Sequence, residues 1–277
     1  MLSYRHSFHA GNFADVLKHV VLVEILQHLL KKDKPFTYID THAGAGLYAL
    51  DSAVANKVQE YKTGIALIDE QQFPELASYF SVIHDLNAKQ LTRYPGSPVI
   101  AEHFLRSQDH AWLHELHPAD FKTLHKHFAN DARFVVKQRD GYTGLLSLLP
   151  PPSRRGVVLI DPSYEIKNEY NQVIDAVIKS HKKFATGTYA IWYPVVQRAR
   201  IRQMERRLAA SGIKNIQKFE LAVQADADEY GMTATGIWVI NPPWSLFDKM
   251  QLVLPKLKSC LAQEQAAFYQ CEVLVAE

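Results

Sequence analysis

Apolar and polar residues follow two periods along the chain, one typical of helices and one typical of buried strands. The segment 13–30 has apolar residues at helical spacing and is followed by Lys31 and Lys32, cations that favour a helix C-terminus. Further helices are expected over 99–106, 119–128, 142–149, 169–183 and 196–210. Strands are expected over 36–40, 112–115, 133–137, 156–160, 187–192, 214–223 and 233–240.

Strands that alternate with helices predict an α/β fold, in which a mostly parallel sheet is covered by helices on both faces. We expect about seven strands, with 214–223 and 233–240 as an antiparallel pair, so that one strand runs against the others. The stretch after the first strand is too long for an ordinary connection. Its two polar helical patterns, 57–70 and 74–87, predict an inserted helical subdomain at 47–97. The main domain then comprises 1–46 and 98–277.

The composition is that of an ordinary globular protein, with 47% hydrophobic and 22% charged residues. No apolar stretch approaches the roughly 20 residues that span a bilayer, and the first residues lack the apolar core of a signal peptide. The two cysteines, Cys260 and Cys271, provide no disulfide framework. We therefore expect a cytoplasmic protein with no membrane partner.

The net charge of +2 implies no strong overall attraction to nucleic acid. The cationic residues nevertheless cluster, and such clusters permit an RNA partner without requiring one. The clusters are Lys31, Lys32 and Lys34; Arg154 and Arg155; and Arg198, Arg200, Arg202, Arg206 and Arg207.

The segment Val157–Tyr164, VVLIDPSY, is the most informative in the chain. It predicts a buried strand that brings Asp161, Pro162 and Tyr164 to the carboxyl edge of the sheet, where open α/β folds bind ligands. The carboxylate of Asp161 and the carbonyl of Pro162 can accept hydrogen bonds from an exocyclic amine, and Tyr164 can stack on a base. These residues indicate methyl transfer onto a nucleobase amino group.

A glycine turn, DTHAGAG, follows the first expected strand. Gly44 and Gly46, with Ala49, also match the dinucleotide fingerprint, which expects an acid about 20 residues later at the end of the second strand. Here the insertion intervenes, and the acid that closes the next strand is Glu115. An acid, Asp40, instead precedes the glycines, and Glu115 and Asp140 follow the next two strands. Carboxylates at this edge favour a cofactor that carries an ammonium and a sulfonium, which indicates S-adenosyl-L-methionine rather than NAD.

The chain also resembles a known family, the bacterial 23S rRNA adenine-N6 methyltransferases of the RlmJ type. The resemblance spans nearly the whole chain, and its N-terminal block is quite specific to that family. The motifs that carry it are Tyr4-Arg5-His6, His9-Ala10-Gly11-Asn12, Ala14-Asp15-Val16-Leu17-Lys18-His19, DTHAGAG, YPGSP, ELHP, RRG with LIDPxYE, and TGTYAIWYPV.

The resemblance implies a monomeric, class I, Rossmann-like rRNA methyltransferase that acts on RNA before ribosome assembly is complete. The residues implied to line the cofactor site are His19, His42, Ser97, Glu115, Asp140, Gly141 and Asp161. Tyr4, His6 and Lys18 are implied to lie beside the target adenine. Together with the motif analysis, this makes Asp161, Pro162, Tyr164 and Lys18 the expected catalytic residues.

Ser163 departs from the family pattern, because the family has Asp-Pro-Pro-Tyr at this strand. The two acceptors come from Asp161 and Pro162, so we expect activity to survive with some loss of preorganisation. A rival segment, Asn241-Pro242-Pro243-Trp244, follows the last strand of the antiparallel pair, far from the cofactor strands. No set of histidines has metal-ligand spacing, so we expect no metal.

Three alternatives stay open from the residues. The same acceptors suit the amines of DNA adenine and of protein glutamine, and Ser163 makes a non-catalytic cofactor- and RNA-binding module conceivable. The residues alone do not separate RNA from DNA, and they do not specify which adenine is modified.

Overall fold

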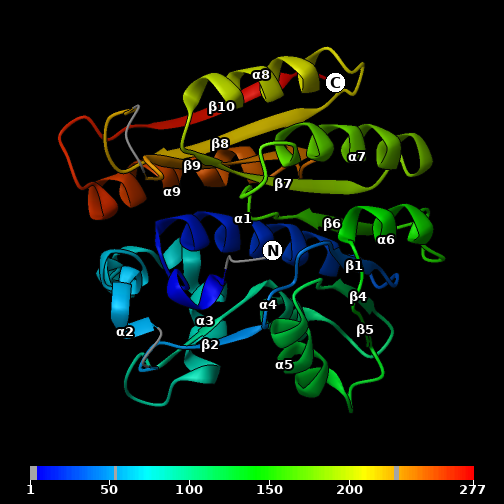
Figure 1. The fold of residues 1–277 in the computed structure, drawn as a ribbon, viewed down its shortest axis with the longest axis horizontal. Coiled ribbons are helices and arrows are strands. Elements are labelled where there is room, and N and C mark those ends of the chain that lie inside the picture. The colour runs from blue at the N-terminus through cyan, green and yellow to red at the C-terminus, as the bar shows by residue number, and fades with distance from the viewer. Residues whose placement is uncertain (1–4, 53–54, 228–230) are drawn as a thin grey trace.

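The computed structural model describes residues 5–52, 55–227 and 231–277. Within these ranges one eight-stranded sheet has the order β10-β8-β9-β7-β6-β1-β4-β5 (Figure 1). The strands of this sheet are β1 (Thr37–Asp40), β4 (His110–His114), β5 (Phe134–Lys137), β6 (Gly156–Ile160), β7 (Thr188–Val195), β8 (Ile216–Ala222), β9 (Ala234–Ile240) and β10 (Tyr269–Val275).

The strand order reverses at the centre of the sheet. From β1 the chain moves outward through β4 and β5, then returns to β6 on the other side of β1, with parallel pairing throughout. The carboxyl ends of β1 and β6 therefore form a topological switch point, where open α/β sheets bind ligands. β7 continues in parallel, whereas β9 and β10 run in the opposite direction.

Helices cover both faces of the sheet, as Figure 1 shows. The helices are α1 (Phe13–Leu30), α2 (Ala55–Val58), α3 (Ala77–Leu86), α4 (Ser97–Phe104), α5 (Pro118–Phe128), α6 (Gly141–Leu148), α7 (Glu169–Lys183), α8 (Arg198–Ala209) and α9 (Leu246–Leu261). α1, α4 and α9 pack on one face, and α6, α7 and α8 pack on the other.

The alternation of side chains in β6 explains the two cores. Val157 and Leu159 belong to the core shared with α1, whereas Val158 and Ile160 belong to the core shared with α7. All four are buried, because a parallel central strand is covered on both faces. This burial is why the sequence of the strand is continuously apolar.

The segment 47–97 leaves and rejoins the main fold at one place. It begins in β2 (Leu47–Ala49) and ends in β3 (Arg93–Pro95), which pair antiparallel. Between these strands lie α2, four short 3-10 turns and α3. In Figure 1 this cyan segment lies beside the blue N-terminal part of α1, and its apolar residues share the core of α1.

The predicted fold class is confirmed, with differences in detail. The sheet has eight strands rather than seven, and two of them rather than one run against the others, because the final strand β10 was not expected. α9 was not expected either. The helix expected at 57–70 is wrong: the segment forms short 3-10 turns around Gly64 instead of one continuous helix.

Candidate active site

A cavity of about 630 Å³ lies at the carboxyl ends of the parallel strands. This volume is within the range of about 300–1,000 Å³ that is typical of small-molecule sites. Its walls come from the start of α1, the glycine turn after β1, and the loops after β4, β5, β6 and β7. The expected site residues that line it are His6, Lys18, His19, His42, Gly44, Ser97, Glu115, Asp140, Gly141, Asp161, Pro162 and Tyr164.

One expected residue, Gly46, is absent from that wall. Gly46 is buried behind the turn, where its carbonyl accepts a hydrogen bond from the Gly96 N–H at 2.7 Å. A Cβ at Gly46 would lie 2.9 Å from the Leu124 side chain, so the glycine allows α5 to pack closely. Tyr4 lies outside the described residues.

The glycine turn fixes the carboxylate of Glu115. Gly44 has φ +60°, and a Cβ there would lie 2.3 Å from the Tyr48 hydroxyl. The Gly44 N–H donates to Glu115 Oε2 at 2.8 Å, and the His117 N–H donates to Oε1 at 2.6 Å. Burial raises the pKa of Glu115. Two backbone donors therefore hold this carboxylate against the cavity at the end of β4.

The Asp40 side chain is buried behind the glycine turn and does not line the cavity. It is fully buried, and Oδ2 accepts hydrogen bonds from the Tyr38 hydroxyl at 2.6 Å and the Ser97 hydroxyl at 2.7 Å. Burial raises the pKa of Asp40 to about 6. The expectation that this acid faces a cofactor charge is therefore wrong. Asp40 acts indirectly, by positioning Ser97 in the cavity wall.

The third strand end contributes Asp140 and Gly141. Asp140 caps α6, since its Oδ1 accepts the Thr143 N–H at 2.7 Å, and the residue remains exposed. A Cβ on Gly141 would lie 1.9 Å from the Thr41 carbonyl oxygen, so only glycine lets α6 begin this close to the turn. His42 lies alongside, and burial lowers its pKa to about 4, which keeps its ring neutral.

Asp161 occupies the end of β6, at the centre of the cavity. Its Oδ2 accepts a hydrogen bond from Lys18 Nζ at 2.6 Å, and its side chain is 14% exposed. No described residue donates to Oδ1. Pro162 follows and is buried, and Ser163 lines the cavity in place of the family proline.

Tyr164 is already packed against other aromatic rings. It has φ +55°, its hydroxyl donates to the Trp192 carbonyl at 2.7 Å, and it is 7% exposed. The ring centroids of Tyr170 and Trp192 lie 4.7 and 5.9 Å from its own. Tyr164 thus lines the cavity as part of an aromatic cluster, with little free ring surface for a base.

Lys18 connects α1 to Asp161 at the end of β6. Asp15, Lys18 and His19 are polar residues at helical spacing in the first part of α1, residues 13–23, which is otherwise apolar and buried. Lys18 Nζ lies 2.9 Å from Asp15 Oδ1 and 2.6 Å from Asp161 Oδ2. Burial lowers the pKa of Lys18, but the charges of Asp15 and Asp161 outweigh it and raise that pKa. Lys18 is therefore an ammonium held between two carboxylates.

Asp15 was not among the predicted site residues, but its carboxylate is a centre of polar contacts. Its Oδ2 accepts hydrogen bonds from His6 Nε2 at 2.8 Å and from the Gly11 N–H at 2.9 Å. Burial raises the pKa of Asp15, but the charges of His6 and Lys18 hold it well below its usual value. A carboxylate inside an apolar helix, three residues before a lysine, was the signal that marks this ion pair.

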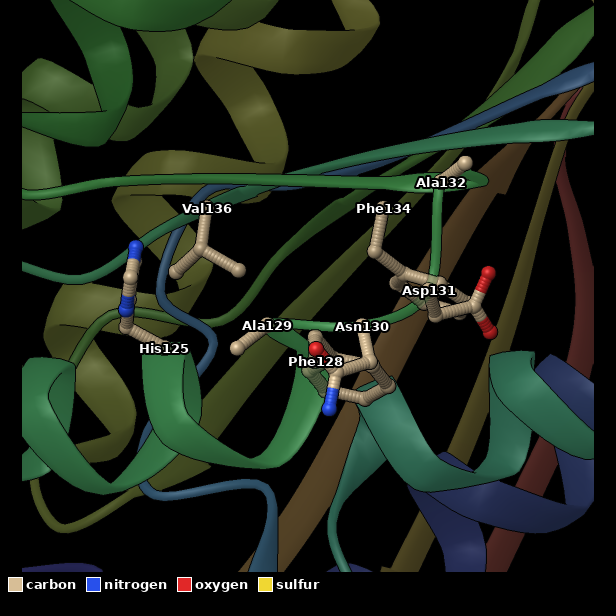
Figure 2. Close-up of a pocket in the computed structure, with 8 residues that line it drawn as sticks. All are labelled: His125, Phe128, Ala129, Asn130, Asp131, Ala132, Phe134 and Val136. Atoms are coloured by element: carbon tan, nitrogen blue, oxygen red, sulfur yellow. The ribbon is translucent and has the colours of Figure 1, made fainter.

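Another hollow, of about 310 Å³, lies between α5 and β5, with His125 near one end and Asp131 near the other (Figure 2). Asp131 is paired with Arg133 at 2.6 Å, and the hollow holds no second carboxylate or nucleophile. No group of three metal-ligating side chains occurs in the described part of the chain. None of its helices is long and apolar enough to cross a membrane.

The geometry distinguishes between the two cofactors considered. In a dinucleotide site, the glycine turn opens directly into a helix whose N-terminus receives the pyrophosphate. Here the turn leads into the strand β2, so no such helix terminus is present after Gly46. Glu115, Asp140 and Asp161, at the ends of β4, β5 and β6, instead suit a cofactor that carries positive charge. The fold and the site define an α/β methyltransferase.

Comparison with known proteins identifies the family. Residues 33–274 match the family model described as "Ribosomal RNA large subunit methyltransferase D, RlmJ". The chain is 50% identical to ribosomal RNA large subunit methyltransferase J of Haemophilus influenzae, over 100% of both chains, and 53% identical to that of Escherichia coli, over 94% of both. The chain belongs to this methyltransferase family, and its cofactor is S-adenosyl-L-methionine.

A solved structure has the same overall fold. A protein from Legionella pneumophila is 40% identical to the chain, with a TM-score of 0.89 over 96% of this chain and 98% of that one. The fold described above is therefore shared with a solved relative over nearly its whole length.

Proposed function

We propose that this protein transfers a methyl group from S-adenosyl-L-methionine to N6 of one adenine in 23S rRNA. The observation that carries the proposal is Asp161, which presents a carboxylate oxygen to the cavity between the cofactor strands and the N-terminal block. The relatives named above are methyltransferases of large-subunit rRNA. We further propose that the enzyme is a cytoplasmic monomer that acts before the large subunit is fully assembled.

The residues in the cavity fit the cofactor. Glu115 has its carboxylate fixed at the end of β4, where it would accept from ribose hydroxyls, and Asp140 would accept from the adenine amine. Gly44, Gly141, His42, Ser97 and His19 would complete this half of the cavity. The cofactor supplies a methyl group on a sulfonium, whose departure as a neutral thioether requires no metal.

Asp161 and Pro162 act on the amine of the target base. The amine is a poor nucleophile, because its lone pair is delocalised into the ring. An acceptor at Asp161 Oδ1 and another at the Pro162 carbonyl would draw the nitrogen toward tetrahedral geometry and stabilise the charge that develops on it. Oδ1 can also take the proton that the nitrogen loses.

Lys18 prepares Asp161 for this role. Its ammonium holds Oδ2 at 2.6 Å and thereby leaves Oδ1 directed to the cavity. Lys18 also lies 5.7 Å from the centre of the Trp192 ring, next to the cluster that contains Tyr164. We propose that the target base enters beside His6 and Tyr4, at the cost of a few kcal/mol for leaving its stack, and that the packed cluster of Tyr164 forms the wall behind it.

We also propose that 47–97 is an inserted subdomain and that 1–46 and 98–277 form the methyltransferase domain. The pairing of β2 with β3 supports this division, because the segment leaves and returns through one pair of strands. Its apolar residues nevertheless share the core of α1, so we expect it to fold together with the main domain.

The test is methyl transfer from labelled cofactor to protein-free 23S rRNA, DNA and protein, followed by mapping of the modified nucleotide. We expect the natural chain, with Ser163, to methylate rRNA. Asp161→Ala should lower the rate at least about 100-fold while the protein stays folded, because a key acceptor is lost.

Asn241→Ala provides the matched control. Asn241 follows β9, which runs antiparallel, so the residue lies at the opposite edge of the sheet, where its amide donates to the carbonyls of Ala185 and Gly187 at 2.8 Å. Its variant should retain the rate of methyl transfer. Methylation of DNA or protein alone, or rescue of an inactive natural chain by Ser163→Pro, would contradict the proposal.

A further inference from the structure

The cavity wall is unusually acidic for a site that accepts RNA. Among the described residues it contains no arginine and a single lysine, and its carboxylates are Asp15, Glu60, Glu115, Asp120, Asp140, Asp161, Glu165 and Glu169. The lysine is Lys18, which is buried and already held by two carboxylates. A phosphodiester chain that follows the target base into this cavity would therefore meet repulsion unless a cation at the rim compensates for it.

The cavity wall extends beyond the cofactor strands and Asp161. Its cofactor end lies at β4 and β5, and Asp161 lies at β6. The wall continues past β6 to Trp192, Pro194 and Val196 of the β7 end and to Tyr170 at the start of α7. The proposed function places the target base beside Asp161, so a neighbouring nucleotide of the RNA would lie toward this far end, away from the cofactor strands.

Arg200 lies at this far end, in the first turn of α8. Its guanidinium carbon is 5.3 Å from the centre of the Tyr170 ring, and Tyr170 in turn packs against Tyr164. Arg200 also donates to the side chain of Gln197. No described carboxylate lies within ion-pair distance of Arg200, whereas Arg198 on the same helix is paired with Glu220 and Asp226, both at 2.7 Å.

We propose that Arg200 binds the backbone phosphate of a nucleotide that flanks the target adenine, and that Tyr170 positions it. The planar guanidinium has donors left for a phosphate, and the Tyr170 ring restricts its orientation through a cation–π contact. This subsite rests on the proposed function, because it presumes that an RNA strand enters the cavity.

The experiment measures the affinity of an RNA fragment that contains the mapped target adenine, as a function of salt, together with the kinetics of methyl transfer. Arg200→Ala should weaken RNA binding about 5- to 10-fold at 0.1 M salt and lower the slope of log Kd against log salt by about 0.7, the contribution of one phosphate on a single strand. KM for RNA should rise while kcat at saturating RNA changes less than twofold.

Four further variants separate the subsite from general charge. Arg206→Ala removes the same charge from the exposed far end of α8 and should leave both Kd and slope unchanged. Arg200→Lys should restore the slope but not the full affinity. Tyr170→Phe should bind as the natural chain does, whereas Tyr170→Leu should lose affinity as Arg200→Ala does.

Failure of the Arg200 subsite can be distinguished from failure of the proposed methyl transfer. Equal effects of Arg200→Ala and Arg206→Ala, or an unchanged salt slope, would overturn the subsite even if rRNA is methylated. If the natural chain binds the fragment through Arg200 but transfers no methyl group, the subsite stands and the proposed reaction is wrong. The binding assay for that case uses an unmethylated 23S rRNA fragment without cofactor.

Discussion

At the residue scale, the site depends on a line of buried charges that runs from Asp15 through Lys18 to Asp161. Breaking a buried ion pair by removing one partner costs more than forming the pair gains, because the remaining charge stays desolvated. Lys18 has two carboxylate partners, so it keeps its charge in a position where an isolated lysine would lose its proton. Asp161 thereby stays fixed in one orientation.

We predict that Asp15→Asn destabilises the protein by about 3 kcal/mol and lowers the rate of methyl transfer, because Lys18 loses the charge of one carboxylate and only one acceptor oxygen remains for Lys18 and the N-terminal block. Urea denaturation and single-turnover kinetics measure the two effects. Asp175→Asn is the control: Asp175 forms an exposed pair with Arg207 at 2.7 Å, so its loss should cost less than about 1 kcal/mol and leave the rate unchanged. Equal destabilisation by the two variants would refute the role of Asp15.

The sequence located the strand-end residues but not their surroundings. Glu115, Asp140 and Asp161 could be placed because the carboxyl ends of parallel strands meet at one edge. The burial of Asp40 could not be predicted, since it depends on Ser97, which is 57 positions away in the chain. For the same reason, the covering of Tyr164 by Trp192 and Tyr170 was not visible in the motif Asp-Pro-Ser-Tyr.

At the element scale, the inserted segment 47–97 holds the N-terminal block against the cavity. Glu60 accepts hydrogen bonds from His9 at 2.8 Å and from the Asn12 amide at 2.9 Å, and the Ile65 N–H donates to the Gly11 carbonyl at 2.9 Å. A Cβ at Gly64 would lie 2.1 Å from that same carbonyl oxygen. The close approach of these two segments explains why a helix cannot continue through 57–70.

We predict that this contact weakens as pH rises. The hydrogen bond to Glu60 raises the pKa of His9 above 6.5, so the stabilisation is complete below pH 6.5 and is lost as pH rises through the raised value. Both side chains are about one-third exposed, which limits the effect to less than about 1 kcal/mol. Glu60→Gln should therefore cost more stability at pH 6 than at pH 8.5, as measured by urea denaturation.

Glu102→Gln is the control for this contact. Glu102 and His127 form a similar pair at 3.0 Å between α4 and α5, and the hydrogen bond to Glu102 raises the pKa of His127. Its variant should show the same pH dependence of stability without a change in methyl transfer at pH 6. Glu60→Gln should lower that transfer several-fold, because His6 and Asn12 belong to the block that it holds. A loss of stability that is the same at both pH values would exclude the proposed titration of His9.

Whole elements were predictable where their hydrophobic pattern was strong. The bounds of α1 and α7 agree with the expected segments 13–30 and 169–183. α7 has a clear helical period, whereas α1 is a long, almost continuously apolar segment that is buried on nearly all sides. β10 was missed because it is an edge strand with half-exposed side chains, such as Tyr269 and Val273, so it lacks a continuous apolar run. Pro255 lies inside α9 and breaks the usual helical signal there.

At the scale of the whole molecule, the switch point divides the cavity into two functional halves. The acids Glu115 and Asp140 lie on the β4 and β5 side, and the residues proposed to receive RNA lie on the β6 and β7 side. Asp161 lies between the two halves. This arrangement implies that the affinity for the cofactor and the affinity for RNA can be changed separately by substitution.

We predict that S-adenosyl-L-methionine stabilises the whole chain through the first half alone. At 100 times its Kd, a ligand that binds only the folded state adds about 2.7 kcal/mol, which raises the Tm of a protein of this size by roughly 5 °C. Glu115→Ala should reduce that shift, because the ribose hydroxyls lose their acceptor. Arg200→Ala should keep most of it, although this variant weakens RNA binding. Asp161→Ala, at the boundary between the two halves, should lose only part of it, although this variant is the one that loses methyl transfer. Thermal unfolding with and without the cofactor measures all four proteins, and a shift lost equally in every variant would show that the two halves do not act separately.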